Sequence, residues 1–554
     1  MNILKSILFI KKNESISFWA TFIGSILIIL LGVKMFWGLS GVMDVLLWDE
    51  SFYLKHGVNL QKKIPINWGP FYSFWYYLLH FFENDKVSLY YLNFKLMSIL
   101  PIVAAFWFFL LRGINYYVAF LICIMWMASG INITVWPKVT QYTNLVVMLG
   151  LIIALNYRGQ FMKYFVLTFI ALCVSYARPE LFLSFLAFSG ITIIVFFLEK
   201  PKLEINQKIF VVFLFVFSGI LIYFLGISLF RDPRSGVAFG QHFMLNYYNW
   251  NQIDLPFWLS GDKEINAIFN HPKSLGDFYK GNTELFNKHI FSNIKNYFNQ
   301  LNTGLSDVFF PKLIFHLPSY LRWLALLSSI VVFIVVSKST KGINFLGKGL
   351  LRNGSILFVL LLFCFPSFIS SILIYPREHY FILQLPLFIF FIGTFFFQSS
   401  EKKGKMGYKI SIVFLIFFIG TFVSPKAKDF AYFDLWRKEK SLCNQKVIAY
   451  LKERNFKGQI EILENEGGLN SFLPKNFKWV QGYTKDESWN NYLAIKNINV
   501  IYITPSLLTD TRFVEDKEWL KFIEQPSKYG FTKIKIGNFT PYLLIKKDLL
   551  INGQ

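Results

Sequence analysis

Residues 181–198 read LFLSFLAFSGITIIVFFL and contain no charged side chain. A run of this length and apolarity is long enough to cross the hydrocarbon core of a bilayer as one helix. The whole chain has the same character, because 54% of its 554 residues are apolar, 19% are aromatic and only 16% are charged. Together with a mean hydropathy of +0.44, these values exclude an ordinary soluble protein and indicate an integral membrane protein.

Similar runs recur through residues 1–424, and we count about eleven that are long enough to span a bilayer. They lie near 17–36, 89–111, 116–132, 140–156, 161–177, 181–198, 208–230, 320–337, 353–375, 379–397 and 408–424. The apolar, aromatic run at 70–82 is too short to span, so we expect a helix that lies in the membrane interface. The predicted fold of residues 1–424 is a polytopic α-helical membrane domain.

The net charge of +23 comes from short cationic runs between alternate apolar segments. This is the pattern of cytoplasmic loops, and it argues against a soluble nucleic-acid binder. The cations of the predicted cytoplasmic side are Lys5, Lys11, Lys12, Arg112, Arg158, Lys163, Lys200, Lys202, Lys208, Lys338, Lys341, Lys348, Arg352, Lys402, Lys403, Lys405 and Lys409. The N-terminus is then cytoplasmic, and loop 37–88, loop 231–319 and the tail lie outside a bacterial cytoplasmic membrane.

The tail, residues 425–554, is more charged and alternates short helical and strand patterns, which predicts a small extracytoplasmic α/β domain. Helical patterns cover 444–453 and 515–524, and strand patterns cover 459–463, 499–503, 531–536 and 542–545. The tail contains neither a GxGxxG motif nor a P-loop, so nothing supports nucleotide binding. We interpret the acidic loop 464–468 (ENEGG) as a plain solvated turn.

Cysteine and histidine give no sign of a metal or redox centre. None of the four cysteines has a partner at metal-ligand or redox spacing. The seven histidines lie on the predicted outer side without ligand spacing, so structural or solvated roles are expected for most of them. They are His56, His80, His242, His271, His289, His316 and His379.

In the long outer loop, 284–301 has the apolar spacing of an amphipathic helix, which favours packing on the membrane domain over a lid.

Charged residues at a membrane boundary are costly to desolvate, so those that gather on the outer side are candidates for function. They occur at 48–53 (WDESFY), 178–180 (RPE) and 375–380 (YPREHY), together with Lys138. Structural interpretations exist for each group: Asp49 as a helix N-cap, an Arg178–Glu180 ion pair, and snorkelling of Arg377. A carboxylate beside several cations also suits an enzyme that deprotonates a hydroxyl and holds the phosphate of a lipid in the headgroup plane.

Three stretches resemble the GT-C membrane glycosyltransferases, within them the protein O-mannosyltransferase-like and lipid A aminoarabinose transferase-like group. Residues 49–53 (DESFY) match that group's Asp-Glu-x-x-Tyr pattern after the first span. Residues 67–72 (NWGPFY) with 75–79 (WYYLL) are similar to its His-Pro-Pro-Leu-Tyr stretch and juxtamembrane helix. Residues 376–386 (PREHYFILQLP) look like its Arg-Tyr followed by a proline at a late span.

The resemblance implies a polyprenyl-phosphate sugar as donor and a lipid, glycan or protein as acceptor. The implied catalytic residues are Asp49, as the base, and Glu50. The implied donor-phosphate contacts are Arg377, Arg178 and Lys138. The residues expected to line the substrate pocket are Tyr53, Trp68, Tyr72, His379 and Tyr380.

Two features depart from the family pattern. Many members carry a second acidic residue between the third and fourth spans, whereas this chain has Asn132, Thr134 and Lys138 there. Asp49 and Glu50 are then the evident ligands for a divalent metal, so the need for a metal stays open. The family's His is also missing from 67–70.

The predicted reaction is a direct displacement at the anomeric carbon, which inverts its configuration. One alternative is an O-antigen ligase or polysaccharide polymerase, which does not need the Asp49–Glu50 pair. Another is a membrane transporter or flippase, which predicts polar groups at the bilayer midplane. The charged candidates of this chain collect at the outer boundary instead.

The topology predicts that a cysteine added near Gly553 is labelled by a membrane-impermeant reagent in intact cells. A reporter fused after Asp85 should also read as external, because the run at 70–82 does not cross the bilayer. Labelling near Gly553 only after permeabilisation of the membrane would show that the predicted topology is wrong.

Overall fold

The computed structural model describes residues 18–62, 64–66, 69–134, 137–228, 234–253, 261–309, 346–396, 442–454, 456, 458–537 and 540–551. This part of the chain is mostly helical. The helices of the membrane domain are α2 (Phe18–Met35), α3 (Asp49–Val58), α4 (Pro70–His80), α5 (Lys86–Leu111), α6 (Tyr116–Met127), α7 (Val139–Asn156), α8 (Gln160–Ser175), α9 (Phe182–Glu199), α10 (Ile205–Leu225), α18 (Leu346–Leu373), α19 (Glu378–Phe381) and α20 (Leu385–Phe396).

Six of the described helical segments are long and apolar enough to cross a membrane. They are Phe18–Gly41, Lys86–Leu111, Val139–Asn156, Pro179–Glu199, Ile205–Leu225 and Asn353–Leu373. Three further predicted spans correspond to shorter apolar helices, at Tyr116–Met127, Gln160–Ser175 and Leu385–Thr394. The predicted spans 320–337 and 408–424 lie outside the described residues. A membrane domain is thus supported, but the predicted number of about eleven spans is not confirmed.

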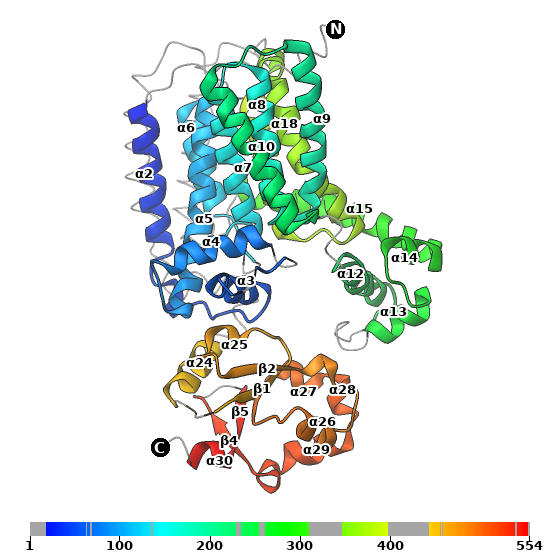
Figure 1. Cartoon of the computed structure of the whole chain (residues 1–554). Helices are drawn as coiled ribbons and strands as arrows, with labels where there is room; N and C mark the ends of the chain where they lie inside the picture. Colours follow the sequence, from blue (N-terminus) through cyan, green and yellow to red (C-terminus); the bar gives the residue numbers. More distant parts are fainter. Residues whose placement is uncertain are drawn as a thin grey trace, which may run out of the picture.

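The predicted outer segments gather at one end of the helix bundle. Figure 1 shows α3, α4, helices α12–α14 and the C-terminal domain at the lower end, whereas the connection between α9 and α10 lies at the upper end. That connection carries Lys200 and Lys202, two of the cations that the sequence assigns to the opposite side. The arrangement agrees with the predicted division of the loops into two groups.

Helix α4 is the short helix predicted for 70–82, and it lies across the end of the bundle in Figure 1. Pro70 begins it, where proline's missing N–H costs nothing. Its close packing on α3 depends on Gly57, because a Cβ there would lie 2.4 Å from Tyr76 Cβ and 2.6 Å from Ser73 O. The two helices therefore form one unit.

The long outer loop contains α12 (Arg234–Trp250), α13 (Gly261–Phe269), α14 (Leu275–Gly281) and α15 (Thr283–Phe309). We call these four helices the outer subdomain. Its small core includes Phe239, Phe243 and Phe278. The predicted helix 284–301 is part of α15, which packs against α18 and α6. The carboxylate of Asp307 accepts the backbone N–H of Gly130 at 2.5 Å, so α15 also holds the turn after α6.

The C-terminal domain is a five-stranded sheet in the order β2-β1-β3-β5-β4. Its elements are α24 (Cys443–Glu453), β1 (Ile460–Glu464), α25 (Leu469–Phe472), β2 (Phe477–Gln481), α26 (Trp489–Ile495), β3 (Val500–Ile503), α27 (Pro505–Thr509), α28 (Thr511–Val514), α29 (Lys517–Glu524), β4 (Phe531–Lys535), β5 (Tyr542–Lys546) and α30 (Lys547–Ile551). β2, β1 and β3 are parallel, and β5 is antiparallel to β3 and β4. The predicted α/β domain is present, and β2 is the strand that the sequence analysis missed.

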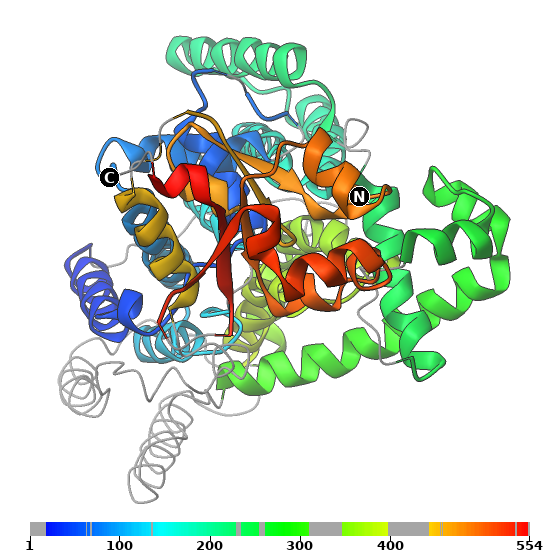
Figure 2. The ribbon, with the colours of Figure 1, turned by 90° about the horizontal axis from the view of Figure 1, so that it is seen from below.

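Each strand alternates its apolar side chains between two cores. Ile462 and Val500 belong to a core that continues into the membrane domain. Leu463 and Ile501 face a separate core that contains Trp489. Figure 2 shows this domain from below, lying over the end of the helix bundle with the outer subdomain to one side. The sheet domain and the bundle are therefore joined by a continuous apolar interior.

Candidate functional site

The candidate carboxylates begin helix α3, where they face different surroundings. Trp48 is the N-cap residue of α3, so the interpretation of Asp49 as the N-cap is wrong. Successive residues of a helix point about 100° apart. Asp49 is exposed, whereas Glu50 is only 5% exposed. The two carboxylates therefore have separate roles.

Glu50 is the centre of a buried hydrogen-bond network that joins four helices. Its Oε1 accepts hydrogen bonds from Tyr72 (2.6 Å), Tyr76 and Asn93 (2.8 Å). Its Oε2 accepts the backbone N–H of Lys138 at 2.8 Å. Burial raises the pKa of Glu50, and the hydrogen bonds from the two tyrosines oppose that shift. One carboxylate thus fixes α3 against α4, α5 and the start of α7.

Lys138 lies beside this network, but its ammonium group points elsewhere. Nζ donates to the carbonyl of Asn132 at 2.7 Å and lies 4.0 Å from the centroid of the Phe94 ring. Burial lowers the pKa of Lys138 to about 7, and the charge of Glu50 opposes the shift. The side chain is buried, so the predicted contact between Lys138 and a donor phosphate needs the phosphate to enter the bundle.

Arg178 lies in a neighbouring buried cluster. Its Nε donates to Glu180 at 2.7 Å, its Nη1 lies 3.3 Å from Thr140 Oγ1, and its guanidinium stacks 4.6 Å from the centroid of the Tyr380 ring. The ion pair with Glu180 that the sequence analysis gave as the structural alternative is present. Cation–π stacking and the ion pair together fix the plane of the guanidinium.

The two clusters are connected through aromatic rings. The rings of Tyr53 and Tyr72 are 5.0 Å apart, and Gly69 packs between Tyr53 and the carbonyl of Ala177, next to Arg178. The series ends where the His379 ring lies 4.3 Å from the Tyr380 ring. We call this series, which runs through Glu50, Tyr72, Tyr53, Arg178, Tyr380 and His379, the contact chain.

The remaining predicted residues lie beside the contact chain or outside the described structure. Arg377 is half-buried at the N-terminus of α19, two residues before His379 in sequence, and its charge helps to lower the pKa of His242. Asp49 is at the exposed start of α3. Trp68 lies outside the described residues. Most of the predicted site therefore forms one region, although its parts come from distant positions in the sequence.

The geometry does not support the divalent metal that the sequence analysis left open at Asp49 and Glu50. Within the described ranges, no three His, Cys, Asp or Glu side chains lie together as a group that could hold an ion. The four groups that contact the two carboxylate oxygens of Glu50 are all hydrogen-bond donors. Its carboxylate is therefore already engaged within the protein.

The loop at 464–468 is not the solvated turn that we expected, because it packs on helix α3. Gly467 lies against Phe52 and Trp479, and a Cβ on Gly468 would be 2.0 Å from Ser51 Oγ and 2.5 Å from Leu47 O. Both glycines have positive φ, at 77° and 108°. The acidic, glycine-rich composition of the loop led us to expect that it is exposed to solvent. Instead, the glycines allow the backbone of the loop to approach α3 closely.

Glu464, at the start of this loop, is also buried, with 1% exposure. Its Oε1 accepts the Leu469 N–H at 2.8 Å, and its backbone carbonyl accepts the Trp479 indole N–H at 3.1 Å. Burial raises the pKa of Glu464 to about 8. The carboxyl group is therefore protonated across much of the physiological pH range.

Further contacts attach the C-terminal domain to the outer loop that precedes α3. Asp44 accepts the backbone N–H groups of Asn444 (2.7 Å) and Gln445 (3.0 Å) at the start of α24. An aspartate at a helix N-terminus satisfies otherwise unpaired N–H groups. The sequence analysis missed Asp44, because no local pattern indicates a partner 400 residues away.

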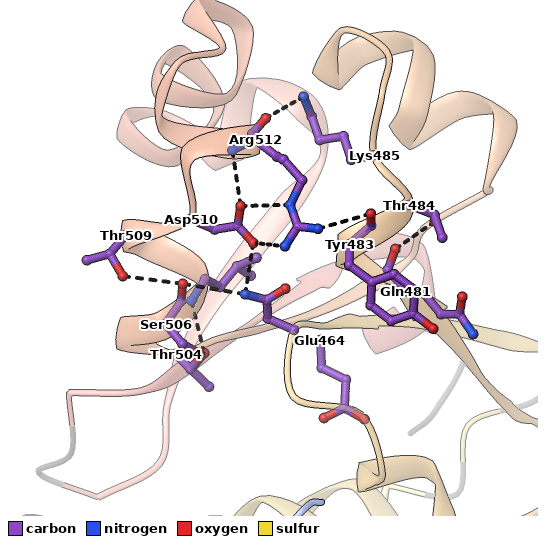
Figure 3. Close-up of polar contacts among 12 residues, drawn as sticks. Glu464, Gln481, Tyr483, Thr484, Lys485, Thr504, Ser506, Thr509, Asp510 and Arg512 are labelled. Carbon is purple, nitrogen blue, oxygen red and sulfur yellow. Dashed lines mark hydrogen bonds and ion pairs between the residues drawn. The ribbon is translucent and has the colours of Figure 1, made fainter. Parts of the chain in front are cut away.

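A second polar network closes the carboxyl end of the parallel strands, as Figure 3 shows. The guanidinium of Arg512 pairs with Asp510 and donates to the carbonyl of Tyr483 at 3.0 Å. Asn465 donates to the same aspartate at 3.0 Å. Glu464 points away from this network in Figure 3. The network joins the loops after β1, β2 and β3.

No family model matches this chain, and no curated protein matches it. The functional argument therefore depends on the site itself.

Gly468→Ala should loosen the C-terminal domain from α3, because the added Cβ meets the Ser51 side chain and the Leu47 carbonyl. Gly530→Ala is the matched control, since Gly530 has φ of 77° and nothing within 4 Å of its Cβ position. We expect the control to lose about 1 kcal/mol, the cost of a left-handed residue, and Gly468→Ala to lose more. Thermal unfolding and limited proteolysis of the detergent-solubilised protein measure both, and equal effects would contradict the docking.

Glu464 should make the protein less stable as the pH rises. Its pKa is about 8 when folded and near the ordinary 4.5 when unfolded, so the folded state binds more protons between these values. The stabilisation is complete below pH 4.5 and disappears as the pH rises towards 8, by at most about 1.4 kcal/mol per pH unit. Glu464→Gln should flatten the dependence of the unfolding midpoint on pH, whereas Glu461→Gln should leave it unchanged.

Proposed function

We propose that this chain is a GT-C-like membrane glycosyltransferase, which moves a sugar from a polyprenyl-phosphate donor to a lipid, glycan or protein acceptor. The observation that carries the proposal is the contact chain at the end of an apolar helix bundle. It brings a carboxylate-bearing helix and two arginine-bearing segments together at one end of the bundle. The hydrocarbon tail of a lipid-linked phosphate keeps that phosphate at the membrane boundary, where this end of the bundle is predicted to lie.

The arginines suit the phosphate of the donor. Arg377 is half-buried at the start of α19, where a guanidinium can bind a phosphate by charge-assisted hydrogen bonds. Arg178 is buried, stacked on Tyr380 and paired with Glu180. We assign the direct phosphate contact to Arg377, and to Arg178 the support of the aromatic ring beside it.

We assign different roles to the carboxylates of Asp49 and Glu50. Asp49 is exposed and has the position of a general base that meets a hydroxyl from the aqueous side. Glu50 is buried beneath it and holds the helix in place through its hydrogen bonds to α4, α5 and α7. We therefore treat Glu50 as a positioning residue and Asp49 as the catalytic residue.

The reaction follows from these roles. Asp49 takes the proton of the acceptor hydroxyl, whose oxygen forms a bond to the anomeric carbon. The bond between that carbon and the phosphate oxygen breaks, and polyprenyl phosphate leaves with the electron pair, stabilised by Arg377. Attack from the side opposite to the phosphate inverts the anomeric configuration.

Asp49→Asn should lower turnover by roughly two to four orders of magnitude while donor binding survives, because it removes only the base.

Arg377→Ala should weaken donor binding and turnover together, by about 1.5 to 3 kcal/mol, because a charge-assisted contact is lost. Glu50→Gln should lower the unfolding temperature as well as activity, since its buried network is broken. Asp486→Asn, at an exposed position of the C-terminal domain, is the control.

The assay uses purified protein, a panel of undecaprenyl-phosphate sugars and a membrane extract as the acceptor source. Consumption of an undecaprenyl-phosphate sugar supports the proposal, whereas consumption only of undecaprenyl-diphosphate glycans would point to a ligase or polymerase. Near-parental turnover of Asp49→Asn would remove Asp49 from the mechanism. Unchanged activity in the presence of a chelator would argue against a required metal.

A further inference from the structure

His242 is a buried histidine of the outer subdomain that the predicted site does not include. It lies on α12 and is 6% exposed. Its Nδ1 is 2.5 Å from the carbonyl oxygen of Ala238, one helical turn earlier. A carbonyl oxygen only accepts, so Nδ1 carries the hydrogen, and Nε2 of the neutral ring is left as an acceptor.

This acceptor has no protein partner within the described part of the chain, although its atom is fully buried. Burial is the main cause that lowers the pKa of His242, to about 3. The charges of Arg377 and His289 act in the same direction. The ring is therefore neutral at physiological pH. A buried acceptor without a donor is costly, and such atoms in folded proteins call for an explanation.

The position of His242 next to the candidate site is fixed by the fold. Its ring stacks on Tyr375 with centroids 5.6 Å apart, and Arg377 follows two residues later. His289, on α15, lies 3.0 Å from the carbonyl of Ile374, and Asn293 donates to the carbonyl of Ile372 at 2.9 Å. The outer subdomain is thus hydrogen-bonded to the segment that leads into Arg377.

His289 provides an internal comparison. It is as deeply buried as His242, but one nitrogen faces the Ile374 carbonyl and the other faces the amide of Asn246 at 3.0 Å. Both ring nitrogens of His289 are therefore engaged within the protein. His242 has one nitrogen engaged and the other available.

We propose that Nε2 of His242 accepts a hydrogen bond from a hydroxyl group of the donor's sugar, and that His242 is a specificity-determining residue of the donor site. This inference rests on the proposed function. The chemistry excludes the phosphate itself, because a phosphate oxygen and a neutral imidazole nitrogen are both acceptors. Arg377 would hold the phosphate, and the sugar is the hydroxyl-bearing group that is bonded directly to it.

The test measures equilibrium binding to the full-length protein in detergent micelles. The probes are undecaprenyl phosphate and its glucose, galactose, mannose and 4-amino-arabinose derivatives. His242→Phe keeps a ring to stack on Tyr375 but removes the acceptor. His242→Gln restores an acceptor near the position of Nε2, and His271→Asn replaces an exposed imidazole of the same subdomain as a control.

We expect the parent to bind one sugar phosphate more tightly than undecaprenyl phosphate. His242→Phe should reduce that preference about three- to tenfold, the size of one hydrogen bond, while its affinity for undecaprenyl phosphate stays unchanged. His242→Gln should recover part of the preference, and His271→Asn should keep all of it. Elution profiles and unfolding temperatures that match the parent show that the variants are folded.

Three other outcomes overturn either the proposed function or the inference. If the parent binds none of these lipids, the proposed function fails and His242 loses its assigned ligand. If the parent shows the preference and both His242 variants keep it, the proposed function stands and the inference is wrong. His242 variants that keep the sugar preference but have a raised KM for the acceptor would likewise overturn the inference. The hydroxyl that binds Nε2 would then belong to the acceptor.

Discussion

The buried carboxylate of Glu50 is the interaction on which the outer end of this structure depends. A carboxylate that leaves water loses several kcal/mol of hydration unless hydrogen-bond donors replace it. Glu50 recovers that loss by bonding to two tyrosines, an asparagine amide and the backbone N–H of Lys138, the N-cap residue of α7. Those donors come from separate helices, so the same bonds that solvate the charge also fix how the helices meet.

The C-terminal domain extends this constraint to the other side of α3. Its glycine loop contacts Leu47, Ser51 and Phe52, while α4 and α5 hold the opposite face through Glu50. Helix α3 is short and carries the exposed Asp49 in its first turn. A short helix gains little stability from its own hydrogen bonds, so packing from both sides is what holds it. The domain therefore helps to hold the helix that carries Asp49.

The outer subdomain contributes in a similar way from the side of α18 and α19. The buried side chains of Asn293 and His289 bond to the carbonyls of Ile372 and Ile374, close to the residues that interrupt the late span. Helix α20 begins only at Leu385, so the polar segment of α19 lies outside the apolar helix. An interrupted span places Arg377 and His379 at the bundle end instead of within the hydrocarbon.

The sequence by itself determined the membrane class, the approximate positions of the apolar helices that the structure describes, the short helix α4 and most strands of the C-terminal domain. These depend on hydropathy and periodicity, which are properties of neighbouring residues. It also indicated Asp49, Glu50, Arg178 and Arg377, since charge is conspicuous beside apolar runs. Only the tertiary structure decided which carboxylate is buried, that the loop at 464–468 is an interface, that Asp44 bonds to the start of α24, and that His242 stacks on Tyr375. Burial and long-range hydrogen bonds arise from residues that are hundreds of positions apart, so no local pattern records them.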